Sequence, residues 1–147
     1  MKIVSGVILA LIVAVGAFLF TKSAEDRVTA DIVARADRFA IPADWNVQND
    51  IVRGERFLCR SSNPCPSIAR RWNTGTELTI EDLQALSQPA GFPIKTEGTC
   101  ERDPGSVGDA TLCRSSGSDG EYEYQLVVSS TSAGEPHNVV LVVEPTP

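Results

Sequence analysis

Histidine is nearly absent from the sequence, which has only His137, and the Gly-x-Ser-x-Gly motif of many serine hydrolases does not occur. A serine or cysteine nucleophile paired with a histidine base would have to use His137, which lies in the predicted turn Gly-Glu-Pro-His-Asn. The sequence also has no glycine-rich phosphate loop after a predicted strand, no cluster of metal ligands and no distinctive carboxylate pair. It therefore predicts no catalytic residue, no metal site and no cofactor, and we expect a protein that is not an enzyme.

Charged residues are missing from residues 3–20, where every residue is apolar or small. A helix needs about 20 apolar residues to cross the hydrocarbon core of a membrane. This segment is close to the lower limit, and Lys2 and Lys22 are placed to reach the two interfaces. The sequence predicts a transmembrane signal anchor at residues 1–23. A cleaved signal peptide is the alternative, with possible cuts after Ala17 or Ser23, although neither site has an Ala-x-Ala pattern.

The basic residues beside this segment do not determine its orientation, because Lys2 precedes it and Lys22 and Arg27 follow it. The rest of the chain has four cysteines within about 120 residues, an even number that is typical of small exported domains. We therefore predict a single-pass membrane protein with its domain outside the cytoplasm, held by residues 3–20. The alternative is a protein that is secreted after cleavage.

The predicted exported part is acidic. Without Lys2 and Lys22 it has 11 basic and 19 acidic side chains, a net charge of −8. Nucleic-acid binding requires a basic surface that displaces counterions from phosphates. We expect no nucleic-acid partner, and the charge itself is sufficient to keep a small exported domain in solution.

The first helix of this part is predicted from apolar residues that recur every three or four positions and so share one helical face. These residues are Val28, Ile32, Ala36 and Phe39. Pro42 is predicted to end the helix. The helix either continues from the membrane segment as a stalk or packs onto the rest of the domain, and its apolar stripe favours packing.

The second helix has a capping-box pattern at its start, with Thr79 as the cap and Asp82 three residues later. Its apolar stripe comprises Ile80, Leu83 and Leu86. Pro89 and Gly91 are predicted to stop it after about ten residues.

Strands are predicted where Val, Ile, Tyr and Trp concentrate or alternate with polar residues. They span residues 45–52, 56–60, 68–72, 94–100, 110–114, 122–129 and 138–143. Turns are predicted at residues 116–120 and 129–136. Residues 145–147 are predicted to form a frayed tail.

The pentapeptide Leu-Cys-Arg-Ser-Ser occurs at residues 58–62 and again at 112–116, and a weaker match relates 42–47 to 89–94. Each weaker match follows a predicted helix. We interpret this as a duplicated helix–strand–strand unit, with copies at about residues 25–75 and 76–130 and an extra strand at 138–143. Two such units pack most simply as an antiparallel sheet with both helices on one face, which is an α+β domain over residues 24–144.

The cysteines are Cys59, Cys65, Cys100 and Cys113, which allow three disulfide pairings. Pairing of nearest neighbours, Cys59 with Cys65 and Cys100 with Cys113, would close one loop in each copy. The spacing differs from the Cys-x-x-Cys of redox enzymes and structural zinc sites. We therefore predict two structural disulfides.

Five arginines lie between residues 53 and 72, whereas the second copy is mainly acidic. The opposite charges of the two copies either complement each other or simply face solvent. Alternatively, Arg60, Arg70 and Arg71 form a patch that binds carboxylate or phosphate groups bidentately. Trp72 and Trp45 either assist such binding or fill the core.

The sequence predicts a membrane-anchored or secreted domain that binds a protein or an anionic component of the cell envelope without catalysis. A small exported enzyme with unrecognised carboxylates as its acid and base is the main alternative. A third possibility is an accessory subunit of a membrane complex, in which the apolar helix is itself an interaction surface.

Overall fold

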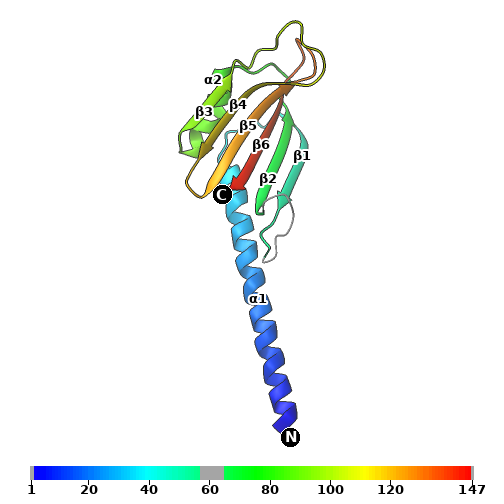
Figure 1. The fold of residues 1–147 in the computed structure, drawn as a ribbon, viewed down its shortest axis with the longest axis vertical. Coiled ribbons are helices and arrows are strands. Elements are labelled where there is room, and N and C mark those ends of the chain that lie inside the picture. The colour runs from blue at the N-terminus through cyan, green and yellow to red at the C-terminus, as the bar shows by residue number, and fades with distance from the viewer. Residues whose placement is uncertain (1, 57–64, 147) are drawn as a thin grey trace.

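The fold was analysed in a computed structural model, which describes residues 2–56 and 65–146, with side chains from Leu11 onward in the first range. Six strands form one sheet in the order β1-β2-β6-β5-β4-β3, and all neighbouring strands are antiparallel (Figure 1). With two α-helices beside the sheet, this confirms the predicted α+β class. The elements are α1 (Lys2–Ala36), β1 (Asn46–Arg53), β2 (Ser67–Asn73), α2 (Ile80–Ser87), η1 (Gln88–Ala90), β3 (Ile94–Gly98), β4 (Ala110–Ser118), β5 (Tyr122–Ser130) and β6 (Asn138–Pro145).

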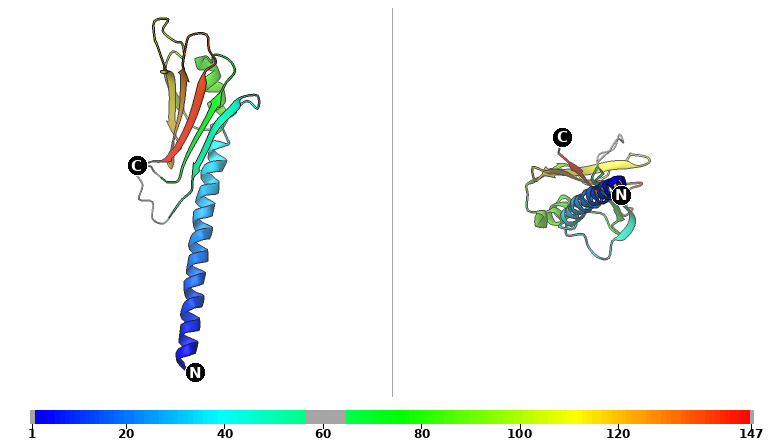
Figure 2. Two further views of the ribbon diagram at one scale, coloured as in Figure 1. Left: turned by 90° about the vertical axis from the view of Figure 1, so that its right-hand side faces the viewer. Right: turned by 90° about the horizontal axis from the view of Figure 1, so that it is seen from below.

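Helix α1 is both a stalk and a packing element, although the sequence analysis treated these as alternatives. It is one continuous helix that projects beyond the sheet, as Figure 1 shows, and its last turns lie on the sheet face that α2 also covers (Figure 2). Ile32, Ala36 and Phe39 are buried as predicted, whereas Val28 is half-exposed at 36%. The helix ends at Ala36 rather than at Pro42, because the chain turns there and the Ala40 N–H donates to the Leu86 carbonyl at 2.9 Å.

The predicted membrane segment, residues 3–20, begins in the part of α1 whose side chains lie outside the described residues. In the portion with described side chains, no helix is long and apolar enough to cross a membrane.

Helix α2 confirms its predicted start. The Asp82 N–H donates to Thr79 Oγ1 at 3.2 Å, and the Thr79 N–H donates to Asp82 Oδ2 at 2.9 Å. Leu83 and Leu86 face the core, and the chain then leaves through η1 and Gly91, whose φ of 84° is in the left-handed region that glycine favours.

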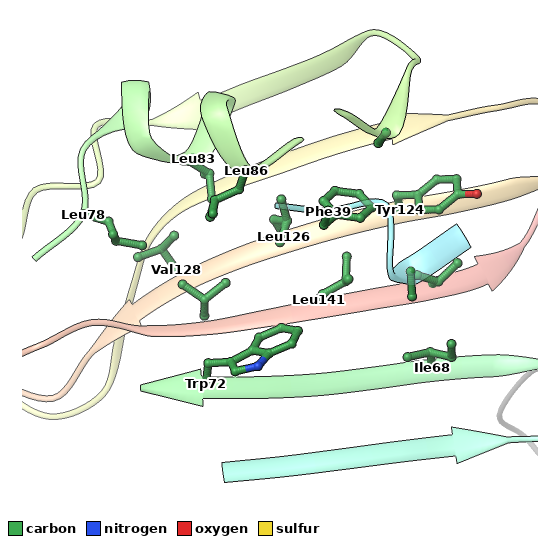
Figure 3. Packing of buried hydrophobic residues seen from close by; sticks show 14 of the residues in the cluster. Phe39, Ile68, Trp72, Leu78, Leu83, Leu86, Tyr124, Leu126, Val128 and Leu141 are labelled. Atoms are coloured by element: carbon green, nitrogen blue, oxygen red, sulfur yellow. The ribbon is translucent and has the colours of Figure 1, made fainter. Parts of the chain in front are cut away.

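The core lies between the helices and one face of the sheet (Figure 3). Leu83 and Leu86 point from α2 toward β5, and Phe39 packs edge-on or tilted against the rings of Phe92 and Tyr124. Trp72 and Trp45 are 6% and 9% exposed and fill the core instead of forming surface anchors. The strands contribute Ile68, Leu126, Val128, Val139, Leu141 and Val143.

Two predicted local features differ in the structure. Arg56 lies outside any strand, which corrects the predicted strand at 56–60, whose remaining positions are outside the described residues. The turn predicted at 116–120 begins only at Asp119, because β4 extends to Ser118. Gly117 is needed for close packing rather than for a turn, since a Cβ there would lie 2.7 Å from the Pro93 carbonyl oxygen.

The disulfide between Cys100 and Cys113 is confirmed, and it joins the chain just after β3 to β4 with their Cα atoms 4.7 Å apart. None of the described cysteines is free. Cys59 lies outside the described residues, so its pairing with Cys65 stays a prediction.

The topology contains a helix followed by an antiparallel hairpin twice, first α1-β1-β2 and then α2-β3-β4, with β5 and β6 in the centre of the sheet. The arrangement does not compare the two copies of the repeated pentapeptide. Residues 112–116 lie in β4, whereas residues 58–62 precede β2 and lie outside the described residues. The duplication therefore stays a prediction.

We expect Thr79→Ala to lower the free energy of unfolding by about 1 kcal/mol, because it leaves the Asp82 N–H without its cap. Denaturant titration of the detergent-solubilised full chain would measure the change. Thr79→Ser keeps the hydroxyl and should be nearly neutral, so an equal loss in both variants would contradict the capping role.

Candidate functional site

The described residues of the predicted patch, Arg70, Arg71 and Trp72, do not share one surface. Arg70, Arg71 and Trp72 are consecutive in β2, and consecutive side chains of a strand point to opposite faces of the sheet. Trp72 lies in the core, Arg70 lies on the same helix-covered face, and Arg71 is exposed on the opposite face. Arg60 lies outside the described residues.

Arg70 is engaged in ion pairs. Its guanidinium pairs with Asp37, just after α1, and its Nε donates to Asp50 Oδ1 of β1 at 3.0 Å. Burial alone would lower the pKa of Arg70, but hydrogen bonds to Asp37 and Asp50 outweigh it and raise this pKa above its ordinary value. Arg70 thus fastens the end of α1 to the β1–β2 pair and is not available to a ligand.

Arg35 makes a second and larger set of ion pairs, which the sequence analysis did not find. Its Nε lies 2.7 Å from Asp31 on the same helix, and its other nitrogens pair with Asp119 and Glu121 in the β4–β5 turn. The guanidinium carbon also lies 4.9 Å from the centre of the Tyr122 ring, within the range of a cation–π contact. We call Arg35, Asp31, Asp119 and Glu121 the stalk clamp.

Asp119 is the most strongly perturbed carboxylate of the stalk clamp. Burial acts to raise its pKa, but the Tyr124 hydroxyl, two backbone N–H groups and Arg35 all stabilise the charged form and hold this pKa well below its usual range. Burial, together with donation to Asp119, raises the pKa of Tyr124. These shifts arise from a closed network between α1 and the sheet, so they indicate a structural role.

A cleft lies at the end of the domain opposite the entry of α1, and we call this end the apex. The cleft has a volume of about 720 Å³ and lies between the β2–α2, β3–β4 and β5–β6 connections. Its acidic side chains are Glu77, Glu81 and Glu101, and Cys100, Arg102 and His137 also line it.

His137 joins two of these connections and is only 3% exposed. In its side chain, Nδ1 accepts the Leu78 N–H at 3.0 Å. In its backbone, the N–H donates to the Thr76 carbonyl and the carbonyl accepts the Thr74 N–H. Burial lowers the pKa of His137, and the charge of Glu77 acts in the opposite direction. The turn position in the sequence gave no sign of this burial, which depends on the β2–α2 connection folding over the ring.

Arg102 organises the β3–β4 connection and was also missed from the sequence. Its guanidinium donates to the carbonyl oxygens of Ser130, Ser106 and Gly108, and so ties the loop to the end of β5. Its Nε is buried and has no hydrogen-bond partner within residues 2–56 and 65–146.

The cleft offers little for catalysis. Nδ1 of His137 already accepts a backbone N–H, and the sulfur of Cys100 is part of a disulfide, so neither is a free base or nucleophile. Among the described residues, no group of three or more His, Cys, Asp or Glu side chains is placed to hold a metal ion.

The sheet face away from the helices carries a different arrangement. In register across β2, β6, β5 and β4 lie Arg71, Val140, Val127 and Arg114, which we call the open-face row. Arg71 also borders a shallow hollow of about 390 Å³ with Asn138 and Ser129. No described carboxylate forms an ion pair with either arginine of the row, but Glu97 of β3 is the register partner of Arg114, and its pKa is lowered by Lys95 and, to a smaller extent, by Arg114.

No protein-family model matches this chain, and neither a curated protein nor a solved structure matches it. The apical cleft and the open-face row are therefore the features from which a function can be inferred.

We expect Arg35→Gln to lower the free energy of unfolding by about 2 kcal/mol, because it leaves half-buried Asp119 without its cation. Arg38→Gln is a matched control, since Arg38 is exposed near the same end of α1 and forms no ion pair within the described part of the chain. Denaturant titration of the full chain would show the difference, and equal stability of the two variants would contradict the clamp.

We expect the protein to lose stability as the pH falls below about 6.5, the ordinary pKa of histidine. Between this value and the lowered pKa of His137, the unfolded chain binds more protons than the folded chain, so the free energy of unfolding rises with pH. A proton on Nδ1 would also remove the acceptor of the Leu78 N–H, so that two donors would face each other in the folded protein. His137→Asn keeps an acceptor without titrating, so its unfolding free energy should depend less on pH, and an unchanged slope would contradict this role.

Proposed function

We propose that the chain is a membrane-anchored binding module, with residues 3–20 in the bilayer and the sheet domain outside the cytoplasm. The observation that carries this proposal is the exposure of the first part of α1. Large apolar side chains between Leu11 and Phe20 are 56% to 79% exposed, with Phe20 the most exposed. Apolar surface of this extent is costly in water and marks contact with a membrane or another protein.

Hydrocarbon is the environment that suits this part of α1 on every side. The large exposed apolar residues are Leu11, Ile12, Val13, Val15, Phe18, Leu19 and Phe20. Together with Ala14 and Ala17, which are also exposed, they make the helix apolar on every side. A helix that packs against one partner needs an apolar stripe, whereas one surrounded by lipid is apolar all round. Lys22, paired with Glu25 at 3.1 Å, follows directly at the expected interface.

The open-face row is the binding surface that we propose, and its partner is a protein segment with carboxylates flanking apolar side chains. Arg71 and Arg114 lie on either side of Val140 and Val127, so the row matches such a segment in charge and polarity. Guanidinium groups bind carboxylates bidentately, and arginine is frequent among the residues that dominate binding energy. The domain is acidic overall, so an acidic partner is repelled from its other surfaces. This repulsion favours binding at the open-face row.

Binding accounts for the structure better than the alternative of a small exported enzyme. Such an enzyme would have to use Glu77, Glu81 or Glu101 at the apical cleft. The other reactive groups of this cleft, Cys100 and His137, are already committed to a disulfide and a backbone hydrogen bond.

The anchor predicts that the full-length chain sediments with membranes and resists extraction at high pH. Intact-mass measurement of the membrane-bound protein should give the complete chain. A mature mass that corresponds to cleavage after Ala17 or Ser23 would contradict the anchor and favour the secreted form.

The binding surface predicts that Arg71→Ala together with Arg114→Ala reduces partner crosslinking about tenfold, because each substitution removes a guanidinium that flanks the two valines of the row. A photoreactive residue at Val140 would be crosslinked in cells, and the partner peptide identified by mass spectrometry. Arg38→Ala is the matched control for lost positive charge. An unchanged crosslinking yield in the double variant, or a crosslinked peptide without acidic residues, would contradict the proposal.

A further inference from the structure

The connections at the apex are strongly acidic. They comprise residues 74–79, 99–109 and 131–137, and the first turn of α2 adjoins them at the end of the domain away from the stalk (Figure 1). Arg102 is the one arginine or lysine of this region. Seven acidic residues accompany it, and none of them forms an ion pair with a residue that the structure describes. They are Glu77, Glu81, Asp82, Glu101, Asp103, Asp109 and Glu135.

The basic residues of the adjoining strands do not offset this charge. Arg71 and Arg114 lie on the open face, whereas the cleft lies beside the start of α2 on the helix-covered face. Lys95 is paired with Glu97 at 2.7 Å within β3. Arg102 itself has its terminal nitrogens on backbone carbonyls. The apex therefore attracts cations and repels anions.

Three of the acidic side chains line the apical cleft itself. Glu77 and Glu81 lie before and in the first turn of α2, and Glu101 lies in the β3–β4 connection. Glu77 is held in place because its Oε1 accepts the Gly134 N–H at 3.1 Å. Ile80 is partly buried and adds apolar surface to the same cleft. A lysine or arginine side chain, which joins methylenes to a cation, matches this lining.

A donor from an almost fully buried ring also opens onto this cleft. His137 lines the cleft although it is only 3% exposed. Its Nδ1 accepts the Leu78 N–H, so the proton of the neutral ring is on Nε2. Nε2 has no hydrogen bond to any described residue, yet the one buried side-chain nitrogen or oxygen without a partner in this part of the chain is Nε of Arg102. Nε2 is therefore not sealed off, and it reaches the cleft as an unused donor.

The unused donor shows what the cation must bring with it. A polar group of a buried ring needs a hydrogen-bond partner, and no described residue supplies one to Nε2 of His137. A peptide carbonyl is such an acceptor. A metal ion or a free alkylammonium ion matches the acidic side chains but offers no acceptor to Nε2, so the combination favours a peptide.

We propose that the apical cleft binds a segment of a partner protein that carries a lysine or arginine side chain. The cation of this side chain lies among Glu77, Glu81 and Glu101, and its methylenes contact Ile80. A backbone carbonyl of the same segment accepts the Nε2 N–H of His137. The cleft volume of about 720 Å³ is within the range of binding clefts in proteins. This site is separate from the open-face row and does not depend on the membrane anchor.

The test uses the only histidine of the chain, because its ring nitrogens give isolated NMR signals in the untagged full chain in nonionic detergent. The probes are acetylated and amidated Ala-Ala-Lys-Ala-Ala and the same peptide with arginine or glutamine at its centre. At a pH about one unit above the ordinary pKa of histidine, the lysine and arginine peptides should shift the Nε2 resonance of His137 in a saturable manner. The glutamine peptide should bind about tenfold more weakly, and high salt should weaken the binding of the other two.

Glu77→Gln together with Glu81→Gln should weaken binding of the lysine peptide about tenfold, as expected for the loss of two exposed ion pairs. Glutamine keeps the oxygen that accepts the Gly134 N–H, so the cleft retains its shape. Glu123→Gln together with Glu144→Gln is the matched control. These two acids are register partners near the stalk end of β5 and β6, and the changes remove the same charge without altering the affinity for the peptide.

Butylammonium is the second control, since it has the charge and methylenes of a lysine side chain without a carbonyl. We expect it to bind about tenfold more weakly than the lysine peptide. Equal affinity for both would show that charge alone is responsible and would overturn the peptide assignment. Equal affinity for the lysine and glutamine peptides, equal effects of the two double variants, or no saturable shift with any peptide would overturn the site.

Discussion

The packing of the last turns of α1 against the sheet is the constraint on which the rest of the molecule depends. Ile32 in these turns and Phe39 just after them are fully or almost fully buried, and burial of such a side chain contributes about 1.5 to 3 kcal/mol. This packing covers the half of the sheet that α2 does not reach, so the short second helix is sufficient to close the core. It also makes the stalk continuous with the core, because the same helix provides both.

Two arginines determine how the helix meets the sheet. Arg35 binds the β4–β5 turn and Arg70 binds the chain after α1, so the helix is held toward both halves of the sheet. Apolar packing is not directional, whereas these ion pairs and hydrogen bonds have defined geometry. The contacts of Arg35 and Arg70 therefore restrict the angle between the stalk and the domain.

The remaining surfaces differ in what they offer. The apical cleft contains His137 and Arg102, but Nδ1 of His137 and the terminal nitrogens of Arg102 hold loops together. The open-face row presents Arg71 and Arg114 without ion pairs in the described part of the chain, beside two valines and with Glu97 opposite Arg114. We infer binding because the unpaired groups lie on exposed surfaces and the reactive groups in the cleft are already engaged.

The features that the sequence determined by itself are local. Thr79 and Asp82 define the start of α2 because a capping box needs only four consecutive residues, and the stripe of α1 follows from helical spacing. The Cys100–Cys113 disulfide was predictable because both residues flank one hairpin connection. Only the tertiary structure decided which side chains meet across the chain. Strand alternation separates Arg70 from Arg71, and long-range contacts bury His137 under residues 76–78 and pair Arg35 with residues more than 80 positions away. No periodicity in the sequence encodes such contacts, since they depend on how distant elements pack.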